Sequence, residues 1–373
     1  MIRRPPRSTQ GVSSAASDVY KRQVHHVQAQ YVVGCDGARS LIRRFIESEM
    51  KDLGFHERWL VVDMILKRDK PALGDHSIQY CNPSRPATYV RCPGLRRRWE
   101  IAVQPHEDNT FITAEPQVSN LLSMWVSHDE ADLERSTVYT FHSLIAEEGR
   151  RGRLLIAGDA AHQTPPFMGQ GMCAGIRDVA NLGWKLADVV QGRTNEDLLD
   201  SYQSEREPNT AEFIHTAIRL GQLINAASSE GALRAAVQKP DGGVEMKSLY
   251  PQLGPGLGRG ELAGRQFGQP QLPAGTRMDD VIGYAPVVVA DAALAHGYLS
   301  PAGVALLTTQ DAPDAAKHLE AFGTLAVLVR PDRYILGSAE TAEALNALVE
   351  PVSYTHLRAH ETRHDLVCRL LLE

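Results

Sequence analysis

The sequence predicts an α/β protein with an inserted antiparallel sheet, that is, an α/β fold with an α+β insert. Residues 30–44 and 153–192 each contain a short apolar strand, a glycine-containing turn and the start of a helix, which is typical of a parallel sheet covered by helices. About a hundred strand-rich residues separate the two segments, and strands and helices alternate again from residue 274. We therefore expect one α/β part interrupted by an antiparallel sheet and a second α/β part after it.

The first segment, Gln30–Arg44, reads QYVVGCDGARSLIRR. Its apolar strand ends in a turn that contains Asp36 and Gly37, and Arg39 follows just before a basic helix start. A DG turn that ends a strand is common in proteins, so this motif alone indicates little.

Runs of β-branched and aromatic residues bounded by Pro, Gly or Asn predict the antiparallel sheet. These strands are Trp59–Leu66, Ser77–Cys81, Ala87–Cys92 and Arg98–Gln104. The sequence YTFHS, which contains Tyr139, Phe141 and His142, comes after this region and just before the next apolar strand. It suits a pocket wall, and it equally suits a core strand with one hydrogen-bonded histidine.

The second segment begins RLLIAGDAAHQTPPFMGQGM. Its apolar strand ends at Gly158, which places the carboxylate of Asp159 at the carboxyl end of the strand, where ligands bind in open α/β sheets. A carboxylate at this place suits a sugar or polyol hydroxyl. Pro165 and Pro166 stiffen the loop, and its glycines let the backbone approach a flat ligand before a helix begins near Met172.

Together, the GDAAH, Pro-Pro and GQG spacing and the earlier DG turn resemble the flavin-dependent aromatic hydroxylases. The resemblance implies that Asp159 holds the ribityl chain of FAD, that residues 169–173 border the pyrimidine edge of the flavin ring, and that the DG turn contacts both FAD and the nicotinamide donor. The cofactor-binding set that it implies is Asp36, Gly37, Arg39, Ala157, Gly158, Asp159, Ala160, His162, Pro165, Pro166, Gly169, Gln170, Gly171, Met172 and Cys173.

Within this family, the runs RRRWEI, GQGMCAGIRD and LVRPDRYILG are most similar to 3-(3-hydroxyphenyl)propionate hydroxylases. The resemblance implies a monooxygenase that uses FAD, NAD(P)H and molecular oxygen to hydroxylate a phenolic acid through a flavin hydroperoxide. His142 or Tyr139 is the candidate catalytic base, because phenols react faster when deprotonated. Candidates for holding the substrate carboxylate are Arg91, Arg96, Arg97 and Arg98, although an arginine run is also typical of a solvated face.

The segment after the GD helix continues as a helix to about residue 227 and carries Tyr202, Glu205, Arg206 and Pro208, which match a family signature. We expect Glu205 and Arg206 to pair across helices rather than to act in catalysis. Later strands and helices are predicted at residues 287–292, 304–309, 312–322, 324–331, 334–337 and 339–348. This last region resembles the thioredoxin-like domain of phenol-type hydroxylases, but it holds no cysteine, so a structural role or a homodimer contact remains for it.

The predicted organisation has six parts. They are a non-native-looking segment 1–23, an FAD-binding domain formed by 24–47 and 150–227, a substrate-binding sheet 48–149, a linker 228–273 that contains a glycine-rich loop, the thioredoxin-like domain 274–351, and a non-native-looking tail 352–373. Both end segments resemble translated sequencing adapter, and a basic targeting arm is the competing interpretation of the first. The Rossmann-like FAD domain then lacks its first βαβ unit and its G-x-G-x-x-G turn, so we expect this chain to bind FAD poorly or not at all and to be of low solubility.

The net charge of −6, together with the basic character of residues 1–23, leaves the remaining chain clearly acidic and argues against nucleic-acid binding. No apolar run approaches the roughly 18 residues that span a bilayer. The five cysteines show neither a CxxC pair nor zinc-ligand spacing, so we expect free thiols, no metal and a cytoplasmic protein.

Two other functions share part of this pattern. A different flavin oxidoreductase, such as a reductase or halogenase, would carry the same GD element, although the four tryptophans do not form the Trp-x-Trp-x-Ile run of halogenases. The chain can also be a catalytically inactive fragment. A yellow colour after purification would distinguish a flavin-loaded protein from such a fragment.

Overall fold

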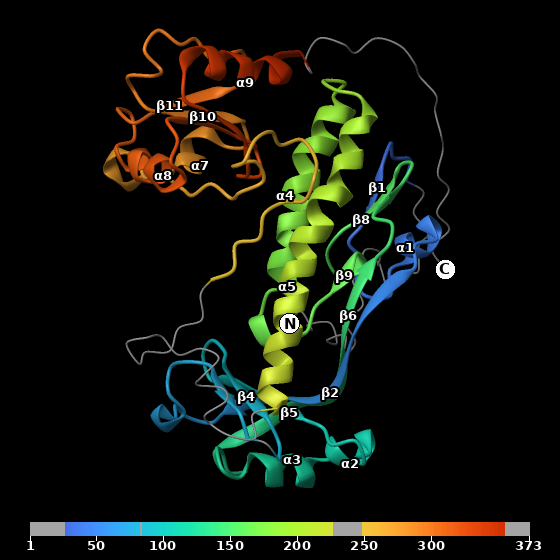
Figure 1. Cartoon of the computed structure of the whole chain (residues 1–373). Helices are drawn as coiled ribbons and strands as arrows, with labels where there is room; N and C mark the ends of the chain where they lie inside the picture. The colour runs from blue at the N-terminus through green and yellow to red at the C-terminus, as the bar shows by residue number, and fades with distance from the viewer. Residues whose placement is uncertain (1–26, 83, 227–247, 355–373) are drawn as a thin grey trace, which may run out of the picture.

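In the computed structural model, residues 27–82, 84–226 and 248–354 are described, and they form three sheets and several helices (Figure 1). The first sheet contains the two apolar strands of the sequence motifs. Strand β1 (Val32–Gly34) pairs in parallel with β8 (Leu154–Ile156), and β7 (Arg150–Arg151) completes the order β1-β8-β7. The DG turn and the GD turn therefore leave the same edge of one sheet. Helix α1 (Leu41–Ile46) packs on it with a small core that includes Ile46 and Ile156.

The second sheet is antiparallel, as the sequence predicts, and it has the order β3-β4-β5-β2-β6-β9. Two of its strands are long, β2 (Met50–Leu66) and β6 (Ala131–Ala146), and they extend from the first sheet to the far end of the molecule (Figure 1). The shorter strands are β3 (Ile78–Tyr80), β4 (Ala87–Arg91), β5 (Arg96–Ala102) and β9 (His162–Gln163).

Side chains alternate between the two faces of this sheet. On one face, apolar residues such as Leu60, Val62 and Trp99 pack against helices α2 (Asn109–Ile112) and α3 (Glu115–Leu122). The other face carries Asp63 and Arg98 together with the buried Trp59. This division decides which side chains face the GD loop.

Two long helices, α4 (Gly171–Val190) and α5 (Ser201–Ala226), lie side by side between the sheets (Figure 1). The buried hydroxyl of Tyr202 on α5 donates to the carbonyl of Ile156 at 2.9 Å, which ties α5 to the strand before the GD turn. Pro208 lies inside α5, where it cannot donate a backbone hydrogen bond to the preceding turn.

The C-terminal unit, residues 278–354, contains a four-stranded sheet of order β11-β10-β12-β13. Its elements are α7 (Met278–Ile282), β10 (Val287–Ala290), β11 (Ala305–Thr308), α8 (Asp314–Phe322), β12 (Ala326–Val329), β13 (Ile335–Ala339) and α9 (Ala342–Tyr354). Separate cores cover its two faces, so all four residues of β10 are buried, as is typical of a sheet between two layers.

The sequence places β10–β13 and α8 within a few residues of their observed bounds, whereas it does not predict α7, and α9 ends at Tyr354, past the predicted end at residue 348. The main difference is the last helix, predicted at 339–348, because Ala339 still belongs to β13 and the helix begins at Ala342. The glycine-rich stretch 254–260 is a loop, as predicted, and part of the predicted linker lies outside the described residues. Within the described part of the chain, no helix has the length and apolar character needed to cross a membrane.

Candidate active site

The GD turn is held in place by its own helix. Gly158 adopts a φ of +63°, which favours glycine, and its backbone N–H donates to Oδ2 of Asp178 on α4 at 3.0 Å. Helix α4 also passes very close, since a Cβ on Gly175 would lie 3.1 Å from the Cα of Gly158. The next residue, Asp159, is exposed at the carboxyl end of β8. The backbone of the turn is therefore held in place at the end of the parallel pair β1 and β8.

The DG turn lies at the end of the neighbouring strand. Oδ2 of Asp36 accepts hydrogen bonds from the backbone N–H groups of Leu41, at 2.7 Å, and Ile42, at 3.2 Å, and so caps α1. Burial opposes ionisation, but these bonds and one from Ser40 lower the pKa of Asp36. Its other oxygen, Oδ1, is buried and has no hydrogen-bond partner among the described residues.

A cavity of about 970 Å³ lies between these two turns and α4. Gly37, Ala157, Gly158, Asp159 and Met172 of the predicted cofactor set line it, together with apolar residues of α4 such as Ile176 and Val179. The residues of that set that belong to the same two turns and loop but do not line the cavity are Asp36, Arg39, Ala160, Pro165, Pro166, Gly169, Gln170, Gly171 and Cys173. The structure therefore brings the two motifs together around one cavity.

The loop before α4 is anchored by aromatic contacts. The ring of Phe167 packs against Trp59 at 5.5 Å and against Phe55 at 5.8 Å, centre to centre, so the loop rests on strand β2. Helix α5 approaches from the other side, where a Cβ on Gly221 would lie 2.5 Å from the Phe167 ring. The loop is held between the antiparallel sheet and α5.

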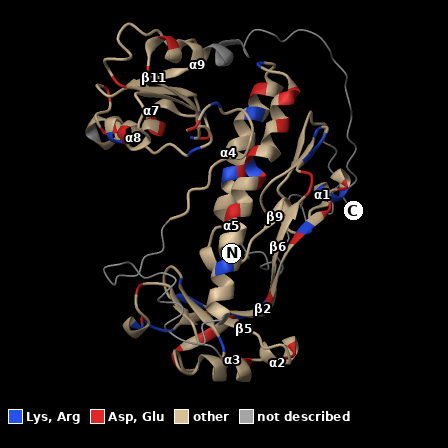
Figure 2. Cartoon of the chain, viewed as in Figure 1, with Lys and Arg blue, Asp and Glu red and all other residues tan. Residues whose placement is uncertain are grey.

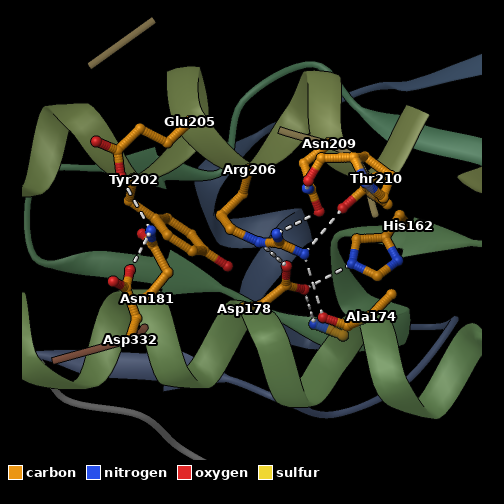
Figure 3. A network of polar contacts seen from close by, with 12 residues as sticks. His162, Ala174, Asp178, Asn181, Tyr202, Glu205, Arg206, Asn209, Thr210 and Asp332 are labelled. Atoms are coloured by element: carbon orange, nitrogen blue, oxygen red, sulfur yellow. Dashed lines mark hydrogen bonds and ion pairs between the residues drawn. The ribbon is translucent and has the colours of Figure 1, made fainter. Parts of the chain in front are cut away.

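His162, a predicted cofactor contact, is buried away from the cavity. Its Nε2 lies 2.6 Å from Oδ2 of Asp178, and the same carboxylate accepts from Nε of Arg206 on α5 at 2.9 Å (Figure 3). Burial opposes ionisation of Asp178, but His162 and Arg206 lower its pKa. His162 therefore contacts the residue that holds the GD turn.

The two candidate bases lie on opposite faces of β6. Tyr139 stands opposite Trp59 in the β2–β6 register, and Trp59 contacts the loop residue Phe167, so Tyr139 is on the loop side of the sheet. His142 stands opposite His56, three positions away, and therefore faces the other side. There its Nδ1 lies 2.8 Å from Nδ1 of His56, whose Nε2 lies 2.7 Å from Oδ2 of Asp52.

A cluster of charges lies on the same face as Tyr139. The buried carboxylate of Asp63 accepts from Nε of Arg98 at 2.7 Å and from Nε of Arg135 at 2.9 Å, and Arg135 also donates to the Tyr139 hydroxyl at 3.1 Å. Burial opposes ionisation of Asp63, but the two arginines lower its pKa. Burial raises the pKa of Glu100, which follows Arg98 on this face.

The other arginines of the run are engaged elsewhere. Arg96 forms a two-bond ion pair with Glu134, Arg97 is buried and donates to backbone carbonyls, and Arg91 donates to the carbonyls of Cys92 and Gly94. Among the four candidates, Arg98 is therefore the one that lies in the Asp63 cluster beside Tyr139.

Several of these residues were not predicted from the sequence, notably Asp178, Asp63 and Arg135. A signal for Asp178 was present, since Asp178, Asn181 and Lys185 recur at i, i+3 and i+7, which is the spacing of one buried helix face. Asp63 is a lone acid in an apolar strand, and a buried acid needs a partner. No local pattern points to Arg135, which meets Asp63 only through strand pairing.

These features fit the ribityl and ring side of FAD. The exposed carboxylate of Asp159 can accept from a polyol hydroxyl, the glycines bring backbone close to a flat ligand, and the N-terminus of the 20-residue helix α4 faces the loop. Among the described residues, no group of His, Cys, Asp and Glu has the arrangement to hold a metal ion.

Comparison with known proteins gives one matching family model, described as an FAD binding domain, over residues 6–217. The chain is 34% identical over 367 residues to a probable NADH-specific resorcinol 4-hydroxylase of Rhodococcus jostii, covering 90% of this chain and 67% of the relative. It is also 41% identical over 200 residues to a 3-(3-hydroxy-phenyl)propionate/3-hydroxycinnamic acid hydroxylase of Mycobacterium avium, covering 53% of this chain and 34% of that relative.

Solved structures share the fold. A ternary complex of aklavinone-11 hydroxylase with FAD and aklavinone matches 87% of this chain and 68% of its own, with a TM-score of 0.63 and 21% identity. Anhydrotetracycline hydroxylase from Streptomyces rimosus matches 86% of this chain and 68% of its own, with a TM-score of 0.62 and 24% identity. The chain thus spans from about a third to two thirds of the length of these relatives and structures.

Proposed function

The chain belongs to the FAD-binding family of flavin-dependent aromatic hydroxylases, and from this premise we propose that it belongs to a monooxygenase that hydroxylates a phenolic acid. A compound such as 3-(3-hydroxyphenyl)propionate is the proposed substrate, with molecular oxygen as co-substrate and NAD(P)H as reductant. The observation that carries the proposal is the exposed carboxylate of Asp159 on a turn that Asp178 and Gly175 hold in place.

Asp159 would bind the ribityl chain, and Gly158 and Met172 would border the flavin. When bound and reduced, the flavin supplies the activation of oxygen for transfer to an aromatic ring. The chain would position the flavin and the substrate and exclude water from the site. The N-terminus of α4 favours negative charge near the loop, and Phe167 and Trp59 close the space between loop and sheet against water.

The phenol would lie under the face of the antiparallel sheet that carries Tyr139. We propose Tyr139 rather than His142 as the group that orients or deprotonates the phenol, because Tyr139 faces the loop side. Its hydroxyl accepts a hydrogen bond from Arg135, which holds the phenol ring of Tyr139 in a defined orientation on this face. Arg98 and Arg135, two cations on one carboxylate, form the proposed contact for the substrate carboxylate.

A second candidate is a phenol without a carboxylate, as in the name of the resorcinol hydroxylase relative. The pairing of both arginines with Asp63 supports it, because their charges are already partly compensated. That relative's name also favours NADH as the reductant.

We further propose that residues 24–47 and 150–227 form the Rossmann-like FAD domain, residues 48–149 the substrate domain and residues 274–351 a thioredoxin-like domain.

Oxidation of NADH and NADPH by the chain with excess FAD, measured across phenols with and without a carboxylate tail, tests the proposal. We expect phenolic acids to stimulate NAD(P)H oxidation more than neutral phenols do. In Arg135→Gln the KM for the acids should rise roughly tenfold or more, because one charge-assisted hydrogen bond is lost. Arg96→Gln, which removes an arginine paired with Glu134 in the same sheet, is the control and should leave KM unchanged. Equal stimulation by both sets would favour the neutral phenol.

A further inference from the structure

Glu205 on α5 lies at the centre of a buried set of charges. Its carboxylate accepts from Nζ of Lys185 at 2.7 Å and from both terminal nitrogens of Arg330 at 2.7 and 2.8 Å. All three side chains are at most 3% exposed. Figure 2 shows acidic and basic residues gathered where α4 and α5 approach the C-terminal unit.

Arg330 belongs to the C-terminal unit, in the turn between β12 and β13. It also donates to Asp332 at 2.6 Å, and Asp332 accepts from Asn181 of α4 at 3.0 Å (Figure 3). The two cations and two anions compensate each other in a buried place, so removal of one leaves an uncompensated buried charge. This set, Lys185, Glu205, Arg330 and Asp332, docks the C-terminal unit onto both helices.

The next residue of α5, Arg206, points to the GD turn instead. It donates to Asp178 at 2.9 Å, and Asp178 holds the N–H of Gly158 at 3.0 Å (Figure 3). Arg206 also contacts the side chain of Asn209, whose amide nitrogen donates to the carbonyl of Pro251 at 2.6 Å. Adjacent residues on a helix project about 100° apart, so Glu205 and Arg206 reach two different neighbours from one turn.

Helix α4 also takes part in both networks. Its Lys185 belongs to the docking set and its Asn181 contacts that set, while Asp178 on the same helix face holds the GD turn. A shift of either helix therefore displaces both networks at once, since interiors are too closely packed to absorb it.

From this shared placement we propose that docking of the C-terminal unit by Arg330 sets the geometry of the Gly158–Asp159 turn, with Glu205–Arg206 and Asp178 as positioning residues. The relevance of the turn to flavin binding rests on the proposed function. The coupling between the docked C-terminal unit and the turn does not. Arg330 does not line the cavity beside Asp159, so an effect of Arg330 on the turn is indirect.

Hydrogen–deuterium exchange of the full chain without ligand tests the coupling. We expect Arg330→Met to speed exchange in a peptide that spans residues 154–163 by about tenfold, because the N–H of Gly158 loses its fixed acceptor. Lys317→Met is the control, since it removes a cation from an exposed ion pair of the same unit. It should leave that peptide unchanged. Faster exchange confined to residues near 185 and 330 would overturn the proposal.

If Arg330→Met unfolds the whole protein, the exchange rate at residues 154–163 in Glu205→Gln tests the coupling instead. Glutamine keeps the size of the side chain and its ability to accept a hydrogen bond. Riboflavin titration of the same variants is a separate experiment. We expect riboflavin affinity to fall in each variant that exchanges faster at residues 154–163. Absence of riboflavin binding by the wild-type chain would count against the proposed function, because riboflavin needs no pyrophosphate site, and the exchange result alone would then decide the coupling. Unchanged exchange at 154–163 in both variants would overturn the coupling.

Discussion

In this protein, burial and nearby charged partners shift the pKa of single side chains in opposite directions. Burial alone would raise the pKa of Glu205, but Arg330, Lys185 and Asn181 lower it to about 2. Burial lowers the pKa of Lys185 to about 8, against the attraction of Glu205. At neutral pH both groups are therefore charged, and the docking set is complete.

Acid should remove this contribution. Because the pKa of Glu205 lies near 2 in the folded chain and near 4.5 in the unfolded one, its stabilisation is fully present above pH 4.5 and is lost as pH falls toward 2. The free energy of unfolding should drop by about 3 kcal/mol from this group across that window. Urea unfolding of the wild type and Glu205→Gln between pH 2 and 6 measures it, and parallel pH profiles for the two proteins would refute the assignment.

At this scale the sequence predicts residue types well and side-chain directions poorly. Asp159 and Gly158 stand at the strand end where the GD pattern puts them, yet His162 of the same motif turns inward to Asp178. A motif in a loop does not state which way each side chain points, since that depends on the helix packed against it.

Among the elements, strand alternation separates the two candidate bases. The spacing of three between Tyr139 and His142 implies opposite faces on any regular strand, so the sequence could have excluded their sharing one pocket. It could not say which face meets the GD loop, because the contact between Trp59 and Phe167 joins residues far apart in the chain.

The packing of helix α5 against the loop gives an element-scale prediction. Gly221→Ala should destabilise the fold, because the new Cβ would meet the Phe167 ring, and overpacking costs about 1–3 kcal/mol against a helix gain of about 1 kcal/mol. Gly183→Ala on α4 is the matched control, with nothing within 4 Å of the added Cβ, and should stabilise. Thermal unfolding of both variants is the measurement, and stabilisation by Gly221→Ala would show that the loop packs elsewhere.

For the whole molecule, the sequence predicts the order and type of the parts but not how they dock. The C-terminal strands are readable from their apolar runs, and they appear in the structure. The contact between Glu205 and Arg330 spans 125 positions and depends on two elements meeting, which no local pattern encodes.

The composition of the cavity wall leads to a prediction about the ligand. The lining formed by the described residues includes Asp159 and no lysine or arginine, so a pyrophosphate finds no cationic partner there. We expect this chain to bind FAD no more tightly than riboflavin, which shares the ring and ribityl chain. Fluorescence titration with both ligands checks this, and binding of FAD a hundredfold tighter would mean that other residues hold the pyrophosphate.

The central claim, that Asp159 holds the ribityl chain, is tested most directly by the same titration of Asp159→Ala. Loss of one charge-assisted hydrogen bond is worth about 1.5–3 kcal/mol, so affinity for FAD and for riboflavin should fall by the same factor, roughly ten- to a hundredfold. Lys317→Met, far from the turn in sequence and exposed, should bind like the wild type. Unchanged affinity of Asp159→Ala for both ligands would contradict the claim.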